Sequence, residues 1–295
     1  MAFSPLLSKI PISRRRFFQS GAIGVATLAL YSGEIERHWV DVTRHEVSLH
    51  NLNGAFDGLR IAQISDIHMD EYTEPTFLRQ VVRQINELKP DVVLMTGDFV
   101  SDRPCPKSFA IGAGWQCGEI LAQLGCTERY AVLGNHDVNV STREVTEALT
   151  QNGVRVLNNT HLPIERGGAR LWLAGVDDPG AGRPDAEAAV PTSIRKRRGE
   201  PVVLMCHAPD YADVVRASPV GDAVALMLSG HTHGGQIRLP LIGPLALPAL
   251  GRKYVAGWYP FGPMQLYVNR GIGTVWLPLR LDCPPEISMF TLRSV

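Results

Sequence analysis

Residues 61–68 read IAQISDIH, a short apolar run that ends in Asp66 and His68. A nearly continuous apolar run of this length is typical of a strand that is buried on both faces. In open α/β sheets, ligands bind in the crevice beyond the carboxyl ends of such strands. The run therefore predicts a central strand that carries two polar side chains to one edge of a sheet.

The same arrangement recurs four times along the chain, in VVLMTGD (92–98), YAVLGNHD (130–137), VVLMCH (202–207) and ALMLSGHTH (225–233). Each polar cluster begins where an apolar run stops, so the sheet edge would collect all of them. The residues that follow the five runs are Asp66, His68, Asp98, Asn135, His136, Asp137, His207, His231 and His233.

Carboxylates and imidazoles in this order predict a site for two metal ions. Two ions roughly 3.5–4 Å apart need a shared anionic ligand and open positions for water and a phosphoryl oxygen. Asp98 is the natural bridge. Asp66 and His68 point to the same side of an extended chain, because the strand period is two, and can hold one ion together. The turn after the last run could direct His231 and His233 to different ions.

The motifs D-x-H, GD, GNHD, an isolated H and GHTH, in this order from Leu59 onward, resemble the signature of the calcineurin-like metallophosphoesterase superfamily. The resemblance implies that His136 donates a proton to the substrate, that Asp137 orients its ring, and that a metal-bridging hydroxide is the nucleophile. It assigns the first metal to Asp66, His68, Asp98 and His233, and the second to Asp98, Asn135, His207 and His231.

Differences between this chain and the motifs of neighbouring subfamilies narrow the type of phosphoesterase that we expect. Purple acid phosphatases place a metal-binding tyrosine where this chain has Ser101, so a tyrosinate-bound ferric ion is not expected. Serine/threonine protein phosphatases carry GDxVDRG, whereas Asp102 and Arg103 are shifted here by one residue, and we discount Arg103 as a phosphate clamp. The sequences GHTHGGQ and YVNRGIG are closer to a bacterial subgroup of small exported phosphodiesterases.

The N-terminus predicts export. Residues 13–18 read SRRRFF and resemble the twin-arginine consensus, and the apolar segment that follows, 21–30, is shorter than the about 20 residues that span a bilayer. It fits the core of a signal peptide. We expect residues 1–30 to be a twin-arginine signal, cleaved near Ala29 or kept as an anchor, and residues 31–295 to be one catalytic domain. The twin-arginine machinery would then deliver the protein to the periplasm or the outer face of the cytoplasmic membrane.

Export of a folded protein bears on the metal. A bare site outside the cytoplasm would take copper or zinc, because affinity follows the Irving–Williams order. Loading before export avoids this competition. We therefore expect two divalent ions, with manganese favoured and iron or zinc as alternatives.

Composition fits one globular catalytic domain. The chain has 295 residues, 45% of them hydrophobic and 20% charged, which is ordinary for a domain with a substantial core. Removing residues 1–30 takes away four basic groups and no acid, which leaves 25 Lys and Arg against 29 Asp and Glu. A mildly acidic mature chain argues against nucleic-acid binding. The basic run 195–198 is expected to be a solvated surface, with contact to anionic lipid or wall polymer as the alternative.

Five cysteines are present, and their spacing matches no zinc module. In an oxidising compartment Cys105, Cys117 and Cys126 lie close enough in sequence to pair, and the odd count leaves at least one cysteine free. Cys206 ends an apolar run and is expected to be a small buried hydrophobe.

The connecting segments favour an alternating αβ plan. Apolar residues at helical spacing predict a helix that starts near Pro75 and ends before Pro90. Ser141 with Glu144 reads as a capping box that opens a helix, which Gly153 closes. The runs RLWLAGV (170–176), QLYVNR (265–270) and EISMFTL (286–292) predict a mixed second sheet. We therefore expect an α/β fold with mixed sheets, a four-layer αββα sandwich, as the resemblance also implies.

Two further regions bear on substrate choice. Residues 239–250 are almost wholly apolar; a buried covering strand is the favoured interpretation, and a lip for a lipid or an apolar leaving group is the alternative. Arg270 could clamp phosphate with its planar fork, and Arg238 competes for that role. Asp177 and Asp178 are expected to be turn residues, with an approach to the site as the alternative.

We interpret the chain as a metal-dependent phosphoesterase, with a phosphodiester as the favoured substrate. That substrate would be a small molecule, a lipid-linked compound or a cell-envelope phosphoester. One alternative is a pyrophosphate-bond hydrolase for a nucleotide-linked glycolipid, of the UDP-2,3-diacylglucosamine hydrolase type. Another is a non-catalytic protein that binds phosphate ligands through metal, against which the presence of Asn135, His136 and Asp137 argues.

Overall fold

The computed structural model describes residues 13–70, 72–104, 106–197 and 199–295, apart from the side chain of Phe17. Residues 1–12 of the predicted export signal, Cys105 and Arg198 lie outside this description.

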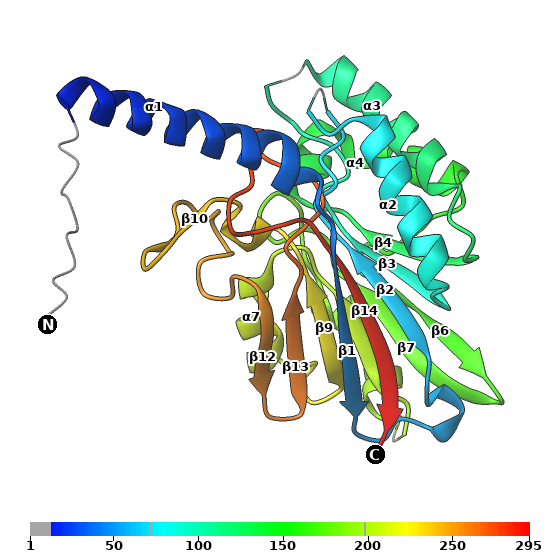
Figure 1. The fold of residues 1–295 in the computed structure, drawn as a ribbon. Helices are drawn as coiled ribbons and strands as arrows, with labels where there is room; N and C mark the ends of the chain where they lie inside the picture. The colour runs from blue at the N-terminus through cyan, green and yellow to red at the C-terminus, as the bar shows by residue number, and fades with distance from the viewer. Residues whose placement is uncertain (1–12, 71, 105, 198) are drawn as a thin grey trace, which may run out of the picture.

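Two six-stranded mixed sheets pack face to face in the described part of the chain (Figure 1). In spatial order, the first sheet consists of β1 (Asp41–Leu49), β14 (Glu286–Ser294), β2 (Arg60–Ile64), β3 (Val92–Thr96), β4 (Glu128–Val132) and β5 (Arg155–Val156). The second consists of β12 (Gly257–Phe261), β13 (Met264–Val268), β9 (Val224–Ser229), β8 (Val202–Met205), β7 (Ala169–Gly175) and β6 (Thr160–Arg166). A separate hairpin pairs β10 (Arg238–Leu239) with β11 (Gly243–Pro244).

Helices cover the outer faces of both sheets. Helices α2 (Pro75–Leu88), α3 (Lys107–Leu121) and α4 (Asn135–Gln151) contribute to one hydrophobic cluster with the first sheet. Helices α5 (Ala186–Ala189), α6 (Thr192–Arg195) and α7 (Ala212–Ala217) contribute to another with the second sheet. The short turns are η1 (Tyr31–Ile35), η2 (Glu36–His38), η3 (Gly54–Phe56), η4 (Pro209–Tyr211) and η5 (His233–Gly235). The predicted four-layer αββα sandwich is confirmed.

Strand β3 shows why an apolar run without alternation indicates a strand that is buried on both faces. Val92 and Leu94 belong to the cluster between the two sheets, whereas Val93 and Met95 belong to the cluster under the helices. Because successive side chains point to opposite faces, a strand with apolar layers on both sides must be apolar throughout.

The C-terminal strand corrects one prediction. The run at 286–292 forms part of β14, which lies in the first sheet between β1 and β2, and not in the second sheet. It runs parallel to β1 and antiparallel to β2. An apolar run indicates burial between layers but carries no information about which sheet completes it.

The helix predictions hold in part. Helix α2 spans the predicted residues, with Pro75 at its start. Helix α4 begins six residues earlier than expected, at Asn135, and Ser141 interrupts it with an extended backbone conformation. The Oγ atom of Ser141 accepts a hydrogen bond from the backbone N–H of Glu144 at 3.3 Å, so the predicted cap marks a restart of the helix.

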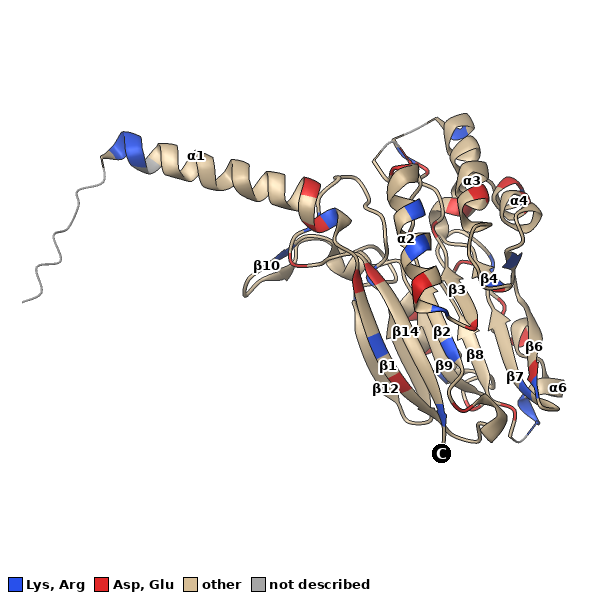
Figure 2. Cartoon of the chain, turned by 45° about the vertical axis from the view of Figure 1, so that its right-hand side comes forward, with Lys and Arg blue, Asp and Glu red and all other residues tan. Residues whose placement is uncertain are grey.

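Helix α1 (Arg14–Leu30) projects away from the sandwich (Figure 2). Its described side chains are exposed, and the first buried residues after it are Ser32 and Glu36. A carboxylate oxygen of Glu36 accepts the backbone N–H of Cys283 at 2.7 Å, which ties the end of this segment to the domain. Among the residues that the structure describes, no helix is both long enough and apolar enough to cross a membrane.

The described cysteines are free thiols. Cys117 is buried and Cys126 is half-buried, so the proposed pairing between them does not form in this structure. Cys206 is buried in the cluster of the second sheet, as predicted.

Candidate metal centre

Five strands deliver their polar clusters to one edge of the sandwich, because β2, β3, β4, β8 and β9 all end there. Five of the predicted ligands have positive φ angles, between 47° and 74°. They are Asp66, His68, Asp98, His231 and His233. Left-handed backbone is uncommon outside glycine and clusters at functional sites, where the surrounding structure holds it in place. The chain therefore turns sharply after each strand and aims these side chains at a common centre.

Two glycines of the motifs are required by close approach. A Cβ atom at Gly134 would lie 2.2 Å from Oδ1 of Asp98, and one at Gly230 would lie 2.3 Å from Oδ2 of Asp66. Both contacts are far shorter than any real Cβ contact. Only glycine lets the GNHD and GHTH loops close around these carboxylates.

Asp66, His68 and His233 form the first group of candidate ligands. The Nε2 atom of His233 lies 3.4 Å from Oδ1 of Asp66 and 3.1 Å from Nε2 of His68. All three residues are buried, and their ligand atoms lie within 4.8 Å of one another. Burial holds the pKa of His68 and of His233 well below the ordinary value, which favours the neutral imidazole that binds metal.

Asp98, His207 and His231 form the second group. The Oδ2 atom of Asp98 lies 3.0 Å from Nε2 of His207 and 3.5 Å from Nε2 of His68, so Asp98 stands between the two groups. Burial raises the pKa of Asp98, but the imidazoles of His207, His136 and His68 outweigh it and hold the pKa well below the ordinary value. Asp98 is thus an anion with access to both groups.

In the second group, one ring nitrogen of His207 faces one ring nitrogen of His231. His207 Nδ1 lies 2.7 Å from the carbonyl oxygen of Thr96, and His231 Nε2 lies 2.7 Å from that of Ala249. A carbonyl only accepts, so each of these nitrogens carries the proton. When both rings are neutral, as in metal-bound histidine, the other nitrogens, His207 Nε2 and His231 Nδ1, are acceptors only 3.1 Å apart. Burial lowers the pKa of His207, but the carboxylates of Asp98 and Asp66 outweigh it and raise the pKa well above the ordinary value. This position therefore attracts a positive charge, which a proton or a metal ion supplies.

Asn135 supports the same conclusion. Its Oδ1 atom is buried and has no hydrogen-bond partner in the described residues, and the residue lines the same pocket as Asp98 and His231. An unpartnered buried oxygen is costly, and metal coordination would satisfy it. The donor set of imidazole, carboxylate and amide oxygen therefore fits two divalent ions.

His136 lies beside the two groups and is held by Asp102. Its Nδ1 atom lies 2.7 Å from Oδ1 of Asp102, and its backbone N–H donates to Oδ1 of Asp98 at 2.9 Å. Burial lowers the pKa of His136, but the carboxylates of Asp98 and Asp102 outweigh it and raise the pKa to about 9.

The expectation that Asp137 orients the His136 ring is corrected. The carboxylate of Asp137 accepts the backbone N–H groups of Phe99, Val100 and Gly134, at 2.8, 3.2 and 2.9 Å. Asp137 follows its histidine in sequence, but on the first turn of α4 its side chain points toward the backbone after β3. Asp102 takes the expected role because the loop after β3 brings it to the ring.

The two arginines proposed as phosphate clamps do not line the pocket. The guanidinium of Arg270 pairs with Oε2 of Glu286 at 3.0 Å and with Oδ2 of Asp41 at 2.7 Å. Arg238 donates to the carbonyl oxygen of Gly234 at 2.8 Å. Arg270 therefore has a structural role between β1 and β14, which corrects the sequence interpretation.

Sequence reasoning missed Arg280, which is fully buried and has no carboxylate partner among the described residues. Its guanidinium donates to the carbonyl oxygens of Arg270, Gly271, Gly273 and Cys283. These bonds fix the loop whose Gly273 N–H donates to the carbonyl oxygen of Asp66 at 2.7 Å. The run PLRLDCPP (278–285) gives no signal that its arginine is buried.

Asp177 and Asp178 are turn residues, as expected, and Asp178 also approaches the site, where it interacts electrostatically with His207, Asp98 and His231. Asp178 Oδ1 accepts the N–H groups of Gly180 and Ala181 at 2.8 and 2.7 Å, and Asp177 Oδ2 accepts that of Arg183 at 2.8 Å. Asp178 is buried, and burial raises its pKa.

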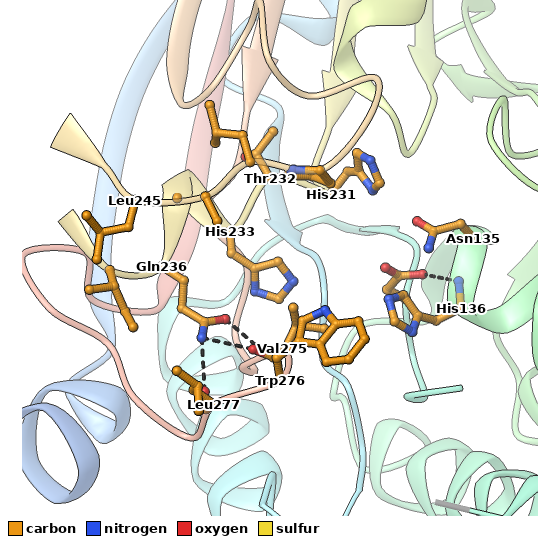
Figure 3. Close-up of a pocket in the computed structure, with 16 residues that line it drawn as sticks. Asn135, His136, His231, Thr232, His233, Gln236, Leu245, Val275, Trp276 and Leu277 are labelled. Carbon is orange, nitrogen blue, oxygen red and sulfur yellow. Dashed lines mark hydrogen bonds between the residues drawn. The ribbon is translucent and has the colours of Figure 1, made fainter. Parts of the chain in front are cut away.

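A pocket of about 440 Å³ opens above the candidate ligands (Figure 3). Asp98, Asn135, His136, His231 and His233 line its floor. Its walls are mostly apolar and include Ile237, Leu245, Leu247, Pro248, Val275, Trp276 and Leu277. The favoured interpretation of residues 239–250 as a buried strand is wrong, because this segment forms a short hairpin and an exposed loop at the pocket mouth.

Gln236 joins the two walls. Its Nε2 atom donates to the carbonyl oxygens of Val275 and Leu277 at 3.1 and 2.9 Å, and its Oε1 atom accepts the N–H of Val275 at 2.8 Å (Figure 3). The last residue of GHTHGGQ thereby fixes the loop that carries Trp276 over the pocket.

Comparison with known proteins gives consistent matches. Residues 59–235 match the calcineurin-like phosphoesterase family. An uncharacterized metallophosphoesterase of Bacillus subtilis, YkuE, is 34% identical over 96% of this chain and 98% of its own length. The phosphodiesterase YaeI of Escherichia coli is 32% identical over 95% of this chain and 99% of its own length. The UDP-2,3-diacylglucosamine pyrophosphatase LpxG of Chlamydia muridarum is 27% identical over 88% of this chain and 91% of its own length.

Proposed function

The chain belongs to the calcineurin-like phosphoesterase family, and from this premise we propose that it is a phosphodiesterase that acts outside the cytoplasmic membrane on an ester with an apolar portion. As a metallophosphoesterase it belongs to a family with a dinuclear metal centre, and the candidate ligand groups of this chain fit such a centre. The observation that carries the proposal is Asp98, a buried anion shared by two ligand groups at the floor of one pocket.

We assign the ligands of the two ions from these groups. Asp66, His68 and His233 would hold one ion, and Asn135, His207 and His231 the other, with Asp98 between them. When bound, two divalent ions would neutralise the phosphoryl oxygens and activate water for attack on phosphorus. Manganese remains our favoured metal, with iron or zinc as alternatives.

His136 is proposed to protonate the leaving group. Asp102 binds Nδ1, which leaves Nε2 as the nitrogen that can donate to a substrate in the pocket. Asp102 is proposed as a positioning residue that fixes the ring and favours the protonated imidazolium. A protein that only bound phosphate would gain nothing from this pair, which argues against a non-catalytic role.

The substrate preference is proposed from the pocket walls and from one relative. Apolar side chains above a polar floor suit an ester whose second substituent is apolar. YaeI is named a phosphodiesterase, and its alignment covers nearly the whole chain. A pyrophosphate-bond hydrolase is the second candidate, since LpxG is named a pyrophosphatase of a diacylated nucleotide sugar.

Export by the twin-arginine route is proposed from residues 13–18 alone. Arg14→Lys with Arg15→Lys should leave a folded, active enzyme in the cytoplasm, as measured by activity in cell fractions. Normal export of this variant would overturn the proposed route, and a single Arg44→Lys substitution, on β1, serves as the control.

A substrate panel tests the enzymatic proposal. Metal-free protein is reloaded with Mn²⁺, Fe²⁺ or Zn²⁺ and assayed with bis(p-nitrophenyl) phosphate, p-nitrophenyl phosphate and a UDP-linked diacyl sugar. The proposal expects the diester to have the highest kcat/KM and metal analysis to find two ions per chain. Preference for the UDP-linked compound would favour the second candidate, and lack of turnover with every metal would overturn both.

A further inference from the structure

Large apolar side chains gather in the open around the mouth of the pocket. On the hairpin side, Leu241 is fully exposed and Ile242 is 70% exposed, and Leu245 continues from them into the pocket wall. On the opposite side, Trp276 is 76% exposed and Leu277 is also exposed. We call these five residues the collar.

The two sides of the collar are joined through the backbone. The N–H of Arg238, at the base of the hairpin, donates to the carbonyl oxygen of Leu281 at 2.9 Å, and Gln236 holds the Val275 to Leu277 loop. The collar is therefore a single surface that continues into the pocket above Asp98 and His136.

Turn hydrogen bonds hold the backbone at Leu241 and Trp276, from the N–H of Ile242 to Leu239 and from the N–H of Leu277 to Val275, but nothing in the described fold uses the apolar side chains. Leu241 and Trp276 have φ angles of 67° and 65°, a left-handed conformation that glycine or asparagine adopts at much lower cost than a bulky residue. Neither side chain gains burial in return. Leu241 and Ile242 do not line the pocket either, so a soluble substrate inside it would leave them in water.

Charge around the collar suits an anionic surface. Residues 237–256, on the hairpin side of the collar, contain Arg238, Arg252 and Lys253 and no aspartate or glutamate. Arg252 is among them and is exposed. Apolar side chains flanked by exposed cations are typical of segments that rest in the interface of an anionic bilayer.

Helix α1 leaves the domain on the same side. In Figures 1 and 2, α1 and the β10 hairpin extend in the same direction from the sandwich. The helix contains no acidic residue, begins with three arginines, and exposes Phe18, Ile23, Val25, Leu28 and Leu30. In a chain that keeps residues 1–30, the helix adds a second apolar and basic element to the face that carries the collar.

We propose that the collar inserts into the surface of a phospholipid bilayer, so that the metal centre acts on a phosphoester carried by a lipid. This inference rests on the proposed phosphoesterase function and adds the source of its substrate. The hairpin tip and Trp276 enter the acyl region, and the apolar walls accept the lipid portion next to the phosphate.

The test uses the full chain and two substrates with the same leaving group. One is soluble bis(p-nitrophenyl) phosphate, and the other is the p-nitrophenyl ester of phosphatidic acid in vesicles of phosphatidylcholine and phosphatidylglycerol. Leu241→Asn with Ile242→Gln removes the hairpin tip, and asparagine tolerates the left-handed backbone. The rate on the vesicle substrate should fall roughly 10- to 100-fold, the effect of burying one or two such side chains, while the soluble rate stays within 2-fold of wild type. Phe109→Gln, a control at a 46% exposed residue of α3, should change neither rate.

A second measurement does not depend on activity. Vesicles with brominated phosphatidylcholine should quench tryptophan emission of the wild type, and Trp276→Phe should remove most of that quenching. Equal quenching in both proteins would overturn the proposal, as would an equal loss on both substrates in the hairpin variant. Self-association that buries the collar, seen as a dimer by sedimentation that the hairpin variant loses, would also overturn it. Lack of wild-type turnover on both the soluble and the vesicle substrate would instead refute the proposed function, because the quenching result stands by itself.

Discussion

At the floor of the pocket the charged and polar side chains are buried and held by the backbone, whereas at its mouth the largest apolar side chains face water. Both regions contain left-handed backbone, at Asp98 below and at Leu241 above. Below, hydrogen bonds and the packing of two sheets hold that conformation in place. Above, the N–H of Ile242 donates to the carbonyl oxygen of Leu239 at 3.2 Å and holds the turn, but no packing covers the Leu241 side chain. The comparison teaches that the floor is complete within the fold, while the mouth has the features of a surface that needs an outside partner.

Removal of the shared anion should have the largest effect. Asp98→Ala takes away the carboxylate that lies between the two ligand groups, so both metals should be lost. We expect a fall in kcat larger than the roughly 10²–10⁴-fold that general acid catalysis contributes. Metal analysis and turnover on the soluble diester would measure it. Retention of two ions and wild-type turnover would contradict the assignment of the floor.

Removal of the proton donor should separate metal binding from chemistry. His136→Ala should keep both ions and lower kcat by roughly 10²–10⁴-fold. The loss should be larger for alkyl esters, whose leaving groups have a high pKa, than for p-nitrophenyl esters, because only the former need the proton. An equal loss across a series of leaving groups would remove the general-acid role, and loss of metal would place His136 among the ligands.

Weakening the hydrogen bond between Asp102 and His136 should also lower kcat, but by less than removal of His136. Asp102→Asn should lower kcat by roughly 10- to 100-fold, the usual size for a residue that orients a functional histidine. In the His136→Ala background the same substitution should have no further effect. Additive losses in the double variant would show that Asp102 acts on stability or on the metals, and not through the ring.

Weakening the loop at the pocket mouth should have the smallest effect, and this effect should be on KM and not on kcat. Gln236→Ala removes the hydrogen bonds that hold the Trp276 loop, and KM for the lipid ester in vesicles should rise roughly 2- to 10-fold, the contribution of one ordinary hydrogen bond. KM for the soluble diester should rise less. A dominant fall in kcat or in metal content would mean that floor and mouth are not independent.

The fold could be predicted as far as its layers. Apolar runs in strands such as β3 fix which segments lie between layers, and the helical spacing from Pro75 onward fixes α2. The place of β14 could not be predicted, because its apolar pattern suits the centre of either sheet. Pairing of β14 with β1 and β2 depends on contacts across the whole chain.

The candidate site could be predicted where chemistry and strand ends coincide, and not where a loop decides. The predicted ligands come together because each directly follows a strand. The partner of His136 could not be found in this way: Asp137 is its neighbour in sequence, but Asp102 reaches the ring from another loop. Likewise, the sequence suggests that Arg270 is free to bind phosphate. Its partners Asp41 and Glu286 are far away in the chain and become apparent only in the structure.

The position of β14 has a consequence for synthesis. The last nine-residue strand lies between β1 and β2, so the first sheet has a gap until residues 286–294 have left the ribosome. Arg280 and the loop that it fixes beside Asp66 also belong to this late segment. We therefore expect the first ligand group to be complete only after β14 has paired with β1 and β2. A variant truncated before Glu286 should lose the first sheet as well as the site.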